Sequence, residues 1–322
     1  MSPNHRSLNG STVLRPAPEG IDPTRPNSAR MFDYLLGGKD NYRADREAAM
    51  RLLEIAPETR TLAWFSRRFL TGAAELAATA GIRQFLDIGA GIPTSPSVYE
   101  TVSAVDPDVR VASVDFDPVV HRHTDAIVAS MPAVTAMLGD FRDPDDLIER
   151  LRTEAAIDFG QPVALLLVGV LHFVMDEERP AELIERFRDV MAPGSYLVFT
   201  HGSTDSDDEL INRTAQVTDG TTAQCAYRSG AEVEKLFEGF EMLDPGVVPI
   251  QQWIGDGLPA TKLVMLGGVC RIPVPVRCAT ESSAYRSSLI RACEQALSGP
   301  DHASSIDGSG ADVCAEIPTA VR

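Results

Sequence analysis

The chain has 322 residues, of which 44% are apolar and 23% are charged, as in a water-soluble globular protein of one large domain with or without an appendage. No stretch approaches the roughly 18 consecutive apolar residues of a transmembrane helix, and the first 28 residues lack the apolar core of a secretory signal. The formal net charge of −17 opposes binding to nucleic acid or to an anionic membrane. We therefore expect a cytoplasmic protein with neither kind of partner.

The cysteines and the acidic residues give little indication of a metal site. The five cysteines are odd in number and form no Cys-x-x-Cys pair, so we expect reduced thiols rather than a zinc site or a disulfide framework. Asp205, Asp207 and Asp208 carry the oxygen ligands that a divalent cation prefers. Because acids in a polar loop of this kind are usually solvated, we expect no metal.

The N-terminal part of the chain divides into an arm and a helical segment. Residues 1–27 are rich in Pro, Ser, Asn and Gly with few large apolar residues, so we expect a disordered arm. Helical spacing of apolar residues begins after the candidate cap Asn27 and continues, in three helices, to the natural stop at Gly81. We assign residues 28–81 to an N-terminal helical cap.

From residue 82, short apolar segments alternate with helical patterns, which is typical of a doubly wound α/β sheet with helices on both faces. Two last strand candidates, separated by a turn-rich segment, would close one edge as an antiparallel pair. The seven predicted strands are 84–88, 109–114, 133–138, 162–170, 195–200, 241–250 and 262–268. Residues 82–271 are thus expected to form one α/β domain, and residues 272–322, rich in Ser, Ala and Gly, a flexible tail.

The most specific motif is FLDIGAG at residues 85–91, a strand that runs into a Gly-x-Gly turn. Gly89 and Gly91 allow the backbone to turn tightly and to approach a ligand closely. A dinucleotide site needs a further glycine where Thr94 stands. Asp87, two residues before the first glycine, suits a cationic ligand such as S-adenosylmethionine (SAM), whose sulfonium and amino groups are both positive.

Two further strand ends bring acids to the same edge of the sheet. Asp115 lies 26 residues after Gly89, near the spacing of about 20 at which an acid accepts ribose hydroxyls. Phe116 would pack on the adenine face, and Asp140 would accept from the adenine amino group. An acid before a helix also suits a helix cap. A cap is therefore the alternative role for Asp140 and the expected role for Asp117.

Together these features resemble the class I SAM-dependent methyltransferases, in particular the actinobacterial S-adenosyl methyltransferase family, long catalogued as a domain of unknown function. The resemblance covers about residues 28–270. It is carried by ARMFDYLLGGKDNY (29–42), FLDIGAGIPT (85–94), VDFDPV (114–119), VALLLVGVLHFV (163–174) and GSYLVFTH (194–201).

This resemblance implies a Rossmann-like, seven-stranded, mostly parallel sheet with SAM as cofactor. The SAM-binding residues that it implies are Gly89, Ala90, Gly91, Asp115, Asp140 and Phe141. Asp87, Phe116 and Gly169, at the ends of the first, second and fourth strands, complete the candidate cofactor site. The resemblance names no acceptor for the methyl group.

Methyl transfer needs the nucleophile and the methyl carbon in line in a dry pocket, and a base only when the acceptor is protonated. His172 and His201, just after the fourth and fifth strands, are the candidate catalytic residues, and a structural role is the alternative for each. The polar segment 34–42 predicts a lid, with Tyr34, Lys39, Asn41 and Tyr42 on the acceptor side, unless it is merely a helix–helix corner.

The fourth strand lacks the Asn/Asp-Pro-Pro-aromatic motif of amino-methyltransferases, which counts against nucleic acid and glutamine as acceptors. We therefore expect a SAM-dependent methyltransferase that acts on a small molecule. A SAM-binding regulatory module without catalysis and, with less support, an NAD(P)-dependent oxidoreductase are the alternatives. The sequence leaves the oligomeric state open.

Overall fold

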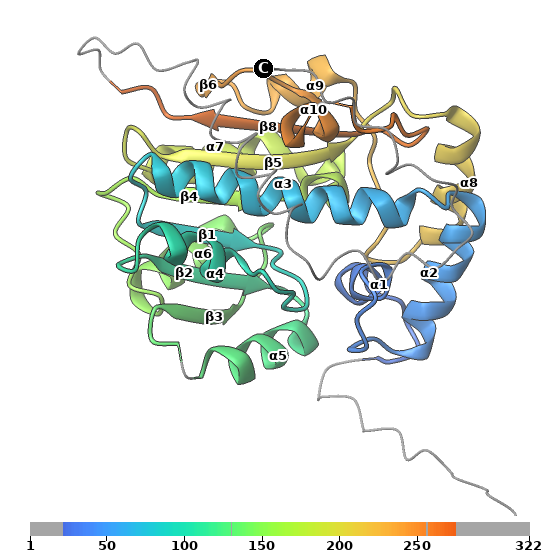
Figure 1. Ribbon diagram of the computed structural model, residues 1–322, viewed down its shortest axis with the longest axis horizontal. Coiled ribbons are helices and arrows are strands. Elements are labelled where there is room, and N and C mark those ends of the chain that lie inside the picture. The colour runs from blue at the N-terminus through green and yellow to red at the C-terminus, as the bar shows by residue number, and fades with distance from the viewer. Residues whose placement is uncertain (1–21, 130, 256, 275–322) are drawn as a thin grey trace, which may run out of the picture.

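The structure is a computed structural model that describes residues 22–129, 131–255 and 257–274. Most of the predicted N-terminal arm and nearly all of the predicted tail lie outside these residues. A central sheet is covered by helices on both faces, and α1 (Ser28–Leu35), α2 (Arg43–Ile55) and α8 (Asp208–Thr218) gather at one end of it (Figure 1).

The sheet has eight strands in the order β3-β2-β1-β4-β5-β8-β6, with β7 paired to β8. The first five strands run parallel, and β8 is antiparallel to β5, β6 and β7. This arrangement confirms the Rossmann-like, mostly parallel α/β fold. The strands are β1 (Gln84–Ile88), β2 (Arg110–Asp115), β3 (Val134–Leu138), β4 (Ala164–Leu167), β5 (Tyr196–Gly202), β6 (Glu241–Met242), β7 (Val248–Pro249) and β8 (Met265–Arg271).

The predicted count of seven strands was one too low, because the segment 241–250 forms two short strands, β6 and β7, instead of one. Between them lie Pro245, which has no N–H to donate to a ladder, and Gly246, whose φ is 91°. After β7 the chain enters a short helix, α10 (Ile250–Ile254), that the sequence analysis did not predict.

The fourth strand is also shorter than predicted, ending at Leu167 rather than at residue 170. Gly169 has a φ of 77°, outside the range of a strand, and its N–H donates to the Thr200 hydroxyl (2.8 Å). The chain therefore leaves the sheet early and continues into the 3-10 turns η1 (Leu171–Phe173) and η2 (Asp176–Glu178), which come to border the candidate site.

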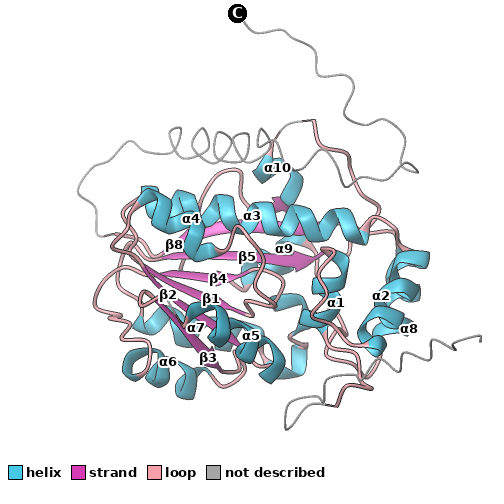
Figure 2. Ribbon diagram, turned by 60° about the horizontal axis from the view of Figure 1, so that its bottom comes forward, coloured by secondary structure: helices cyan, strands magenta, loops and turns pink. Residues whose placement is uncertain are grey.

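Successive residues of the strands face two separate cores. Phe85 belongs to the core under α3 (Thr59–Thr79), α4 (Val98–Val105) and α10, whereas Leu86 belongs to the core under α6 (Pro144–Thr153), α7 (Pro180–Val190) and α9 (Gly230–Lys235). Figure 2 shows α3 and α4 on one face and α6 and α7 on the other. Burial on both faces explains why β4, at the centre of the sheet, is apolar at every position.

Two helices begin at caps that the sequence predicts, and a third begins at a capping box. The Asn27 side chain accepts from the first turn of α1, Ser229 and Glu232 form the capping box of α9, and Asp117 caps α5 (Pro118–Val128). In the part of the chain that the structure describes, no helix combines the length and the apolar character that crossing a membrane requires.

Candidate cofactor and acceptor site

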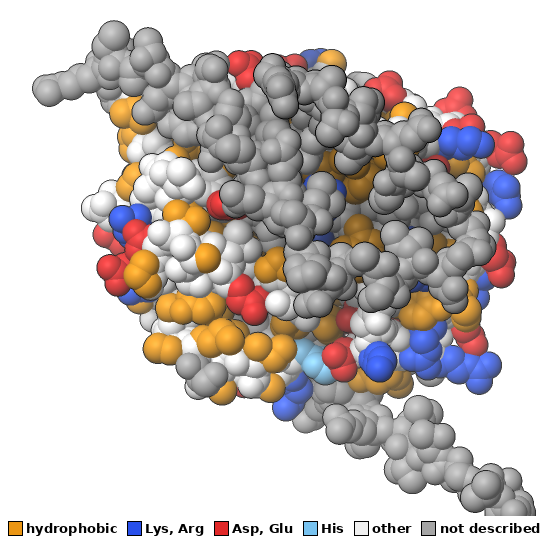
Figure 3. All heavy atoms as spheres, in the orientation of Figure 1, with side chains coloured by type: hydrophobic (Ala, Val, Ile, Leu, Met, Phe, Trp, Pro, Cys, Tyr) orange, Lys and Arg blue, Asp and Glu red, His pale blue; other side chains and the backbone are white. Residues whose placement is uncertain are grey.

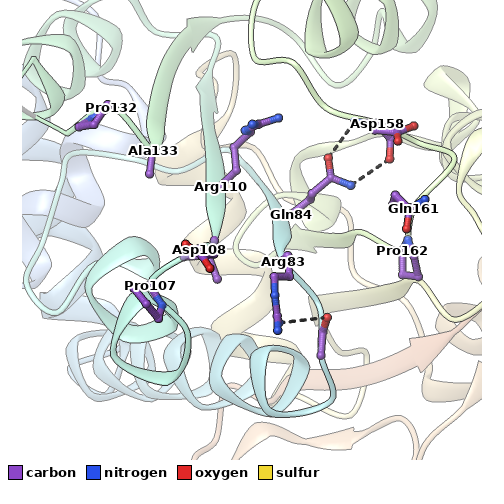
Figure 4. A pocket seen from close by; sticks show the side chains of 12 residues that line it. Arg83, Gln84, Pro107, Asp108, Arg110, Pro132, Ala133, Asp158, Gln161 and Pro162 are labelled. Carbon is purple, nitrogen blue, oxygen red and sulfur yellow. Dashed lines mark hydrogen bonds between the residues drawn. The ribbon is translucent and has the colours of Figure 1, made fainter.

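Two cavities lie at opposite edges of the sheet. One, of about 550 Å³, lies at the amino ends of the strands, beside Gln84, Arg110 and Pro162 (Figure 4). Two of its polar residues already bond to each other: the Gln84 side chain donates to the Asp158 carbonyl (2.9 Å) and accepts from the Asp158 N–H (2.8 Å). Because parallel α/β sheets bind ligands at the carboxyl ends of their strands, this cavity is not the candidate site.

The other cavity, of about 440 Å³, lies at the carboxyl ends of the parallel strands, within the size range of small-molecule sites. It extends from the glycine loop after β1 to the helices of the cap. Of the predicted cofactor residues, all but Asp87 line it. They are Gly89, Ala90, Gly91, Asp115, Phe116, Asp140, Phe141 and Gly169.

The glycine loop needs its glycines for both conformation and space. Gly89 and Gly91 each have a φ of 68°, which disfavours residues with a Cβ. A Cβ on Gly89 would lie 2.5 Å from Cγ2 of Val170, whereas one on Gly91 would meet no atom within 4 Å. The loop is therefore packed against the end of β4 at its first glycine and open at its second.

Asp115 fixes this loop through both carboxylate oxygens. Its Oδ2 accepts from the Gly91 N–H (2.9 Å) and its Oδ1 from the Asp117 N–H (2.9 Å). Burial raises the pKa of Asp115 to about 6. Since a carboxylate oxygen can accept more than one hydrogen bond, each oxygen keeps capacity for a ligand hydroxyl.

An arginine that the sequence analysis did not single out joins the residues at the ends of β2 and β3. The Arg142 guanidinium donates to Asp140 through Nε (2.9 Å) and Nη2 (2.7 Å) and lies 5.6 Å from the centroid of the Phe116 ring. It also pairs with Glu178 (3.3 Å). The ring of Phe141 stacks on Phe187 in the core. The ring of Phe116, which contacts Arg142 and is 38% exposed, is therefore the one that remains accessible to a ligand.

A second unpredicted arginine lies beside Asp87. Arg67, on α3, lines the cavity, and its Nη2 donates to the carbonyls of Thr94 (2.9 Å) and Pro96 (2.6 Å). Burial raises the pKa of Asp87 to about 6, while the charge of Arg67 acts in the opposite direction. No local pattern could have revealed this role, because Arg67 stands in an apolar helix before the sheet begins.

The two predicted catalytic histidines have different surroundings. His172, in η1, lines the cavity, and its buried Nδ1 has no hydrogen-bond partner. Burial, together with the charge of His201, lowers the pKa of His172 to about 3, so its ring is neutral. His201 is outside the lining, and both of its nitrogens are engaged, Nδ1 with the Gly202 carbonyl (2.8 Å) and Nε2 with Arg228 Nη1 (2.6 Å).

The four residues predicted to face the acceptor lie away from the described lining of this cavity. Tyr34 is in the last turn of α1, and Lys39, Asn41 and Tyr42 follow in a loop that is folded around Asp33. Oδ2 of Asp33 accepts from the Asn41 side chain (2.6 Å) and from the Asp40 N–H (3.0 Å). The cap reaches the cavity through neighbours in the same segment, which are Met31, Phe32 and Leu35 of α1.

A buried cluster of charges, here called the Arg30 latch, joins the cap to the cofactor strands. Arg30 donates through Nε to Asp45 (2.9 Å) and through Nη1 to Asp117 (3.0 Å), and all three side chains are at most 3% exposed. The Tyr42 ring lies 5.2 Å from the guanidinium carbon. Since the Asp117 N–H donates to Asp115, the latch leads directly to the glycine loop.

The predicted acidic cluster on the loop before α8 has other partners. Asp207 caps α8 by accepting from the Leu210 N–H (3.1 Å), and the Asp205 carboxylate accepts from the Ser203 hydroxyl (3.2 Å). Among residues 22–129, 131–255 and 257–274, no three His, Cys, Asp or Glu side chains are grouped so that they could hold a metal ion.

The edge that these residues form suits SAM. The open second glycine leaves room beside the loop, Asp115 can accept from the ribose, and Phe116 offers an aromatic face for the adenine. Arg67 and Asp87 provide one charge of each sign, which matches the amino-acid end of SAM. Fold and site together define a class I SAM-dependent methyltransferase.

Comparisons with known proteins agree with this class. The sequence profile of the S-adenosyl methyltransferase family matches residues 15–273, and the chain belongs to this family. It is therefore a methyltransferase enzyme whose cofactor is SAM. A search of curated proteins gave no match.

Two solved structures are similar over most of the chain. One is a putative methyltransferase from Thermobifida fusca YX, with 34% identity and a TM-score of 0.74 over 80% of this chain and 98% of that one. The other is a DUF574 family protein from Streptomyces avermitilis MA-4680, with 34% identity and a TM-score of 0.74 over 78% of this chain and 99% of that one. Neither description states an acceptor.

Proposed function

We propose that this enzyme transfers the methyl group of SAM to a small molecule bound between the glycine loop and the cap. The observation that carries the proposal is the continuous 440 Å³ cavity, which joins Gly89 and Asp115 to the apolar faces of α1 and α3. A partly enclosed space next to the cofactor suits a small acceptor.

In the proposed site, SAM supplies a methyl group on a positively charged sulfur. The residues of the chain would bind and orient it: Asp115 would hold the ribose and Arg67 the carboxylate, while Asp87, outside the lining, would offer its negative charge to the amino group. A lone pair of the acceptor atom would form the bond to the methyl carbon as the electrons of the carbon–sulfur bond pass to sulfur, which gives S-adenosylhomocysteine, and a proton on the acceptor atom would pass to water as the product leaves the cavity. The apolar cap excludes water from the reacting atoms.

His172 is proposed as the hydrogen-bond partner of the acceptor. Its place in the cavity lining and its unpartnered Nδ1 support this role. With a pKa of about 3 it is a weak base at neutral pH, which favours orientation of the acceptor over proton removal. We assign His201, fixed by Gly202 and Arg228, a positioning role behind it, because the two rings lie 6.2 Å apart.

For Tyr34, Lys39, Asn41 and Tyr42 we propose a supporting role in place of direct contact with the acceptor. The hydrogen bonds of Asp33 with Asp40 and Asn41 hold their loop, and Tyr42 covers the Arg30 latch. We further propose that the enzyme works in the cytoplasm and not on nucleic acid. The net charge of −17 and the free thiols of Cys225 and Cys270 support these two points.

The experiment that tests the transfer uses SAM with an isotopically labelled methyl group. Purified enzyme is first titrated calorimetrically with SAM, S-adenosylhomocysteine and NAD, and micromolar binding of the first two but not of NAD is expected. Labelled SAM and enzyme are then added separately to the low-molecular-mass and the macromolecular fractions of a cell extract.

We expect label in the low-molecular-mass fraction and none from Asp115→Ala enzyme. Label in the macromolecular fraction alone would contradict a small-molecule acceptor. Tight SAM binding without any transfer in either fraction would favour a regulatory module instead.

A further inference from the structure

Charged side chains are distributed unevenly along the cavity. The five charged residues of its lining are all attached to the cofactor half: Arg67 to the carbonyls of Thr94 and Pro96, Asp115 to the glycine loop, and Asp140, Arg142 and Glu178 to one another. The acceptor half is the remaining wall, which comes from α1, α2, the lining residues of α3 other than Arg67, α8, residues 221–227 and residues 263–265. In the described chain, its lining residues carry no charge.

The ion pairs of α1 and α2 are directed away from the cavity. Arg30 and Asp45 are paired inside the latch, and Arg43 and Glu47 form an ion pair on the outer side of α2, where 86% and 43% of their side chains are exposed. The end of the molecule formed by α2 and α8 accordingly shows basic and acidic side chains on its surface (Figure 3). The cavity side of α1 and α2 presents Met31, Phe32, Leu35 and Leu52.

Three polar side chains of the acceptor half, those of Thr214, Thr218 and Tyr227, are already engaged with neighbours and offer little compensation for a charge. The Thr214 hydroxyl donates to the Leu210 carbonyl (2.8 Å) and the Thr218 hydroxyl to the Thr214 carbonyl (3.2 Å), within α8 itself. Tyr227 contacts Thr214 (3.4 Å). An ion in this half would lose its water without gaining an opposite charge, which is strongly unfavourable.

From this division we infer that the methyl acceptor is an uncharged, largely apolar molecule, and that the acceptor half selects against carboxylates, phosphates and ammonium groups. The inference rests on the proposed function and adds the chemical class of its substrate. The apolar faces of α1 and α2 would contact the body of the acceptor, and His172 its polar group.

The test compares three probes of the same ring system on enzyme saturated with S-adenosylhomocysteine: 1-naphthol, 1-naphthoate and 1-naphthylmethylammonium. Binding is measured by calorimetry at pH 7. We expect 1-naphthol to bind at least about tenfold more tightly than either ion, a difference of roughly 1.4 kcal/mol. Equal or tighter binding of either ion, or no saturable binding of 1-naphthol, would overturn the inference.

Two residues of α2 provide matched variants. Leu52 lines the cavity, whereas Met50 is 43% exposed and lies outside the lining. Leu52→Glu should lower the affinity for 1-naphthol about tenfold and raise that for 1-naphthylmethylammonium, while Leu52→Gln should have a smaller effect and Met50→Glu none. Equal effects of Leu52→Glu and Met50→Glu would contradict the assignment of this wall.

Binding of S-adenosylhomocysteine, measured on every variant, distinguishes a failure of the acceptor class from a failure of the proposed function. Enzyme that binds it but prefers a charged probe refutes the acceptor class and leaves the proposed function intact. Wild-type enzyme that does not bind it refutes the proposed function itself. The ranking of the three probes on wild-type enzyme requires no variant to fold.

Discussion

The cofactor half and the acceptor half of the cavity are built in opposite ways. In the cofactor half, carboxylates and guanidinium groups hold backbone groups in place, as Asp115 holds Gly91 and Arg67 holds Thr94. In the acceptor half, α1 and α2 present apolar side chains to the cavity, and the Thr214 hydroxyl of α8 donates to a carbonyl of its own helix. The cofactor, whose structure is fixed, would thus be bound by directed hydrogen bonds. The acceptor would be selected by its shape and by the exclusion of charge.

The Arg30 latch joins the two halves, and breaking it should have the largest effect. Arg30→Met would leave Asp45 and Asp117 buried without a counter-charge, and loss of one partner of a buried pair destabilises a protein by about 3–5 kcal/mol. We expect a decrease of this size in the free energy of unfolding, measured with urea. Arg43→Met, which removes only the exposed pair with Glu47, is the control; equal stability of the two variants would show that the latch contributes nothing.

Removal of the Asp115 carboxylate should affect the cofactor half alone. Asp115→Ala loses the acceptor of two backbone N–H groups and of the ribose, and charge-assisted hydrogen bonds contribute about 1.5–3 kcal/mol each. We expect the calorimetric affinity for S-adenosylhomocysteine to fall by about a hundredfold or more. Asp108→Ala, at the opposite edge of the sheet, should change nothing. Unchanged affinity of Asp115→Ala would refute the ribose assignment.

The smallest expected effect is a dependence of cofactor affinity on pH. Asp87 and Asp115 have pKa values raised to about 6 by burial, so they are neutral at pH 5 in the free enzyme, although the ligand favours their charged forms. One such group predicts an affinity about tenfold weaker at pH 5 than at pH 7. Affinity that does not change over this range would contradict the role of both carboxylates.

The same shifts predict the opposite trend for the stability of the free enzyme. A carboxyl whose pKa is higher in the folded state than its ordinary value of 3.8 stabilises the fold fully below pH 4, and this contribution is lost as the pH rises through 6. Urea unfolding of wild-type and Asp115→Asn enzyme from pH 4 to 7 isolates the contribution of Asp115. The contribution of Asp115 to the free energy of unfolding should decrease from pH 4 to 7, while the affinity for the cofactor increases.

The fold and the strand-end residues could be predicted because their signals are local. Glycine and aspartate at a strand end stand a few residues apart, and the parallel sheet brings such ends together. The arginines could not be predicted in this way, since Arg30 meets Asp117 from 87 positions away and Arg67 meets Thr94 from 27. Likewise, the direction of Tyr34 and Tyr42 depends on how their loop folds around Asp33, which composition does not indicate.

The division of the strand at 241–250 has a similar origin. Its apolar pattern is that of one strand, and the break depends on whether the neighbour, β8, is paired across Pro245 and Gly246. The structure pairs β6 and β7 with different parts of β8. Register between distant segments decides such cases, and a single sequence does not contain it.

Because one side chain, Asp117, caps α5, anchors Arg30 and, through its N–H, holds Asp115, the order of the cap and the occupancy of the cofactor site are thermodynamically linked. Linkage is reciprocal: if bound SAM stabilises the ordered cap, then an acceptor that orders the cap must raise the affinity for SAM by the same free energy. The two ligands should therefore bind with positive cooperativity, and the enzyme should retain its cofactor best when its substrate is present.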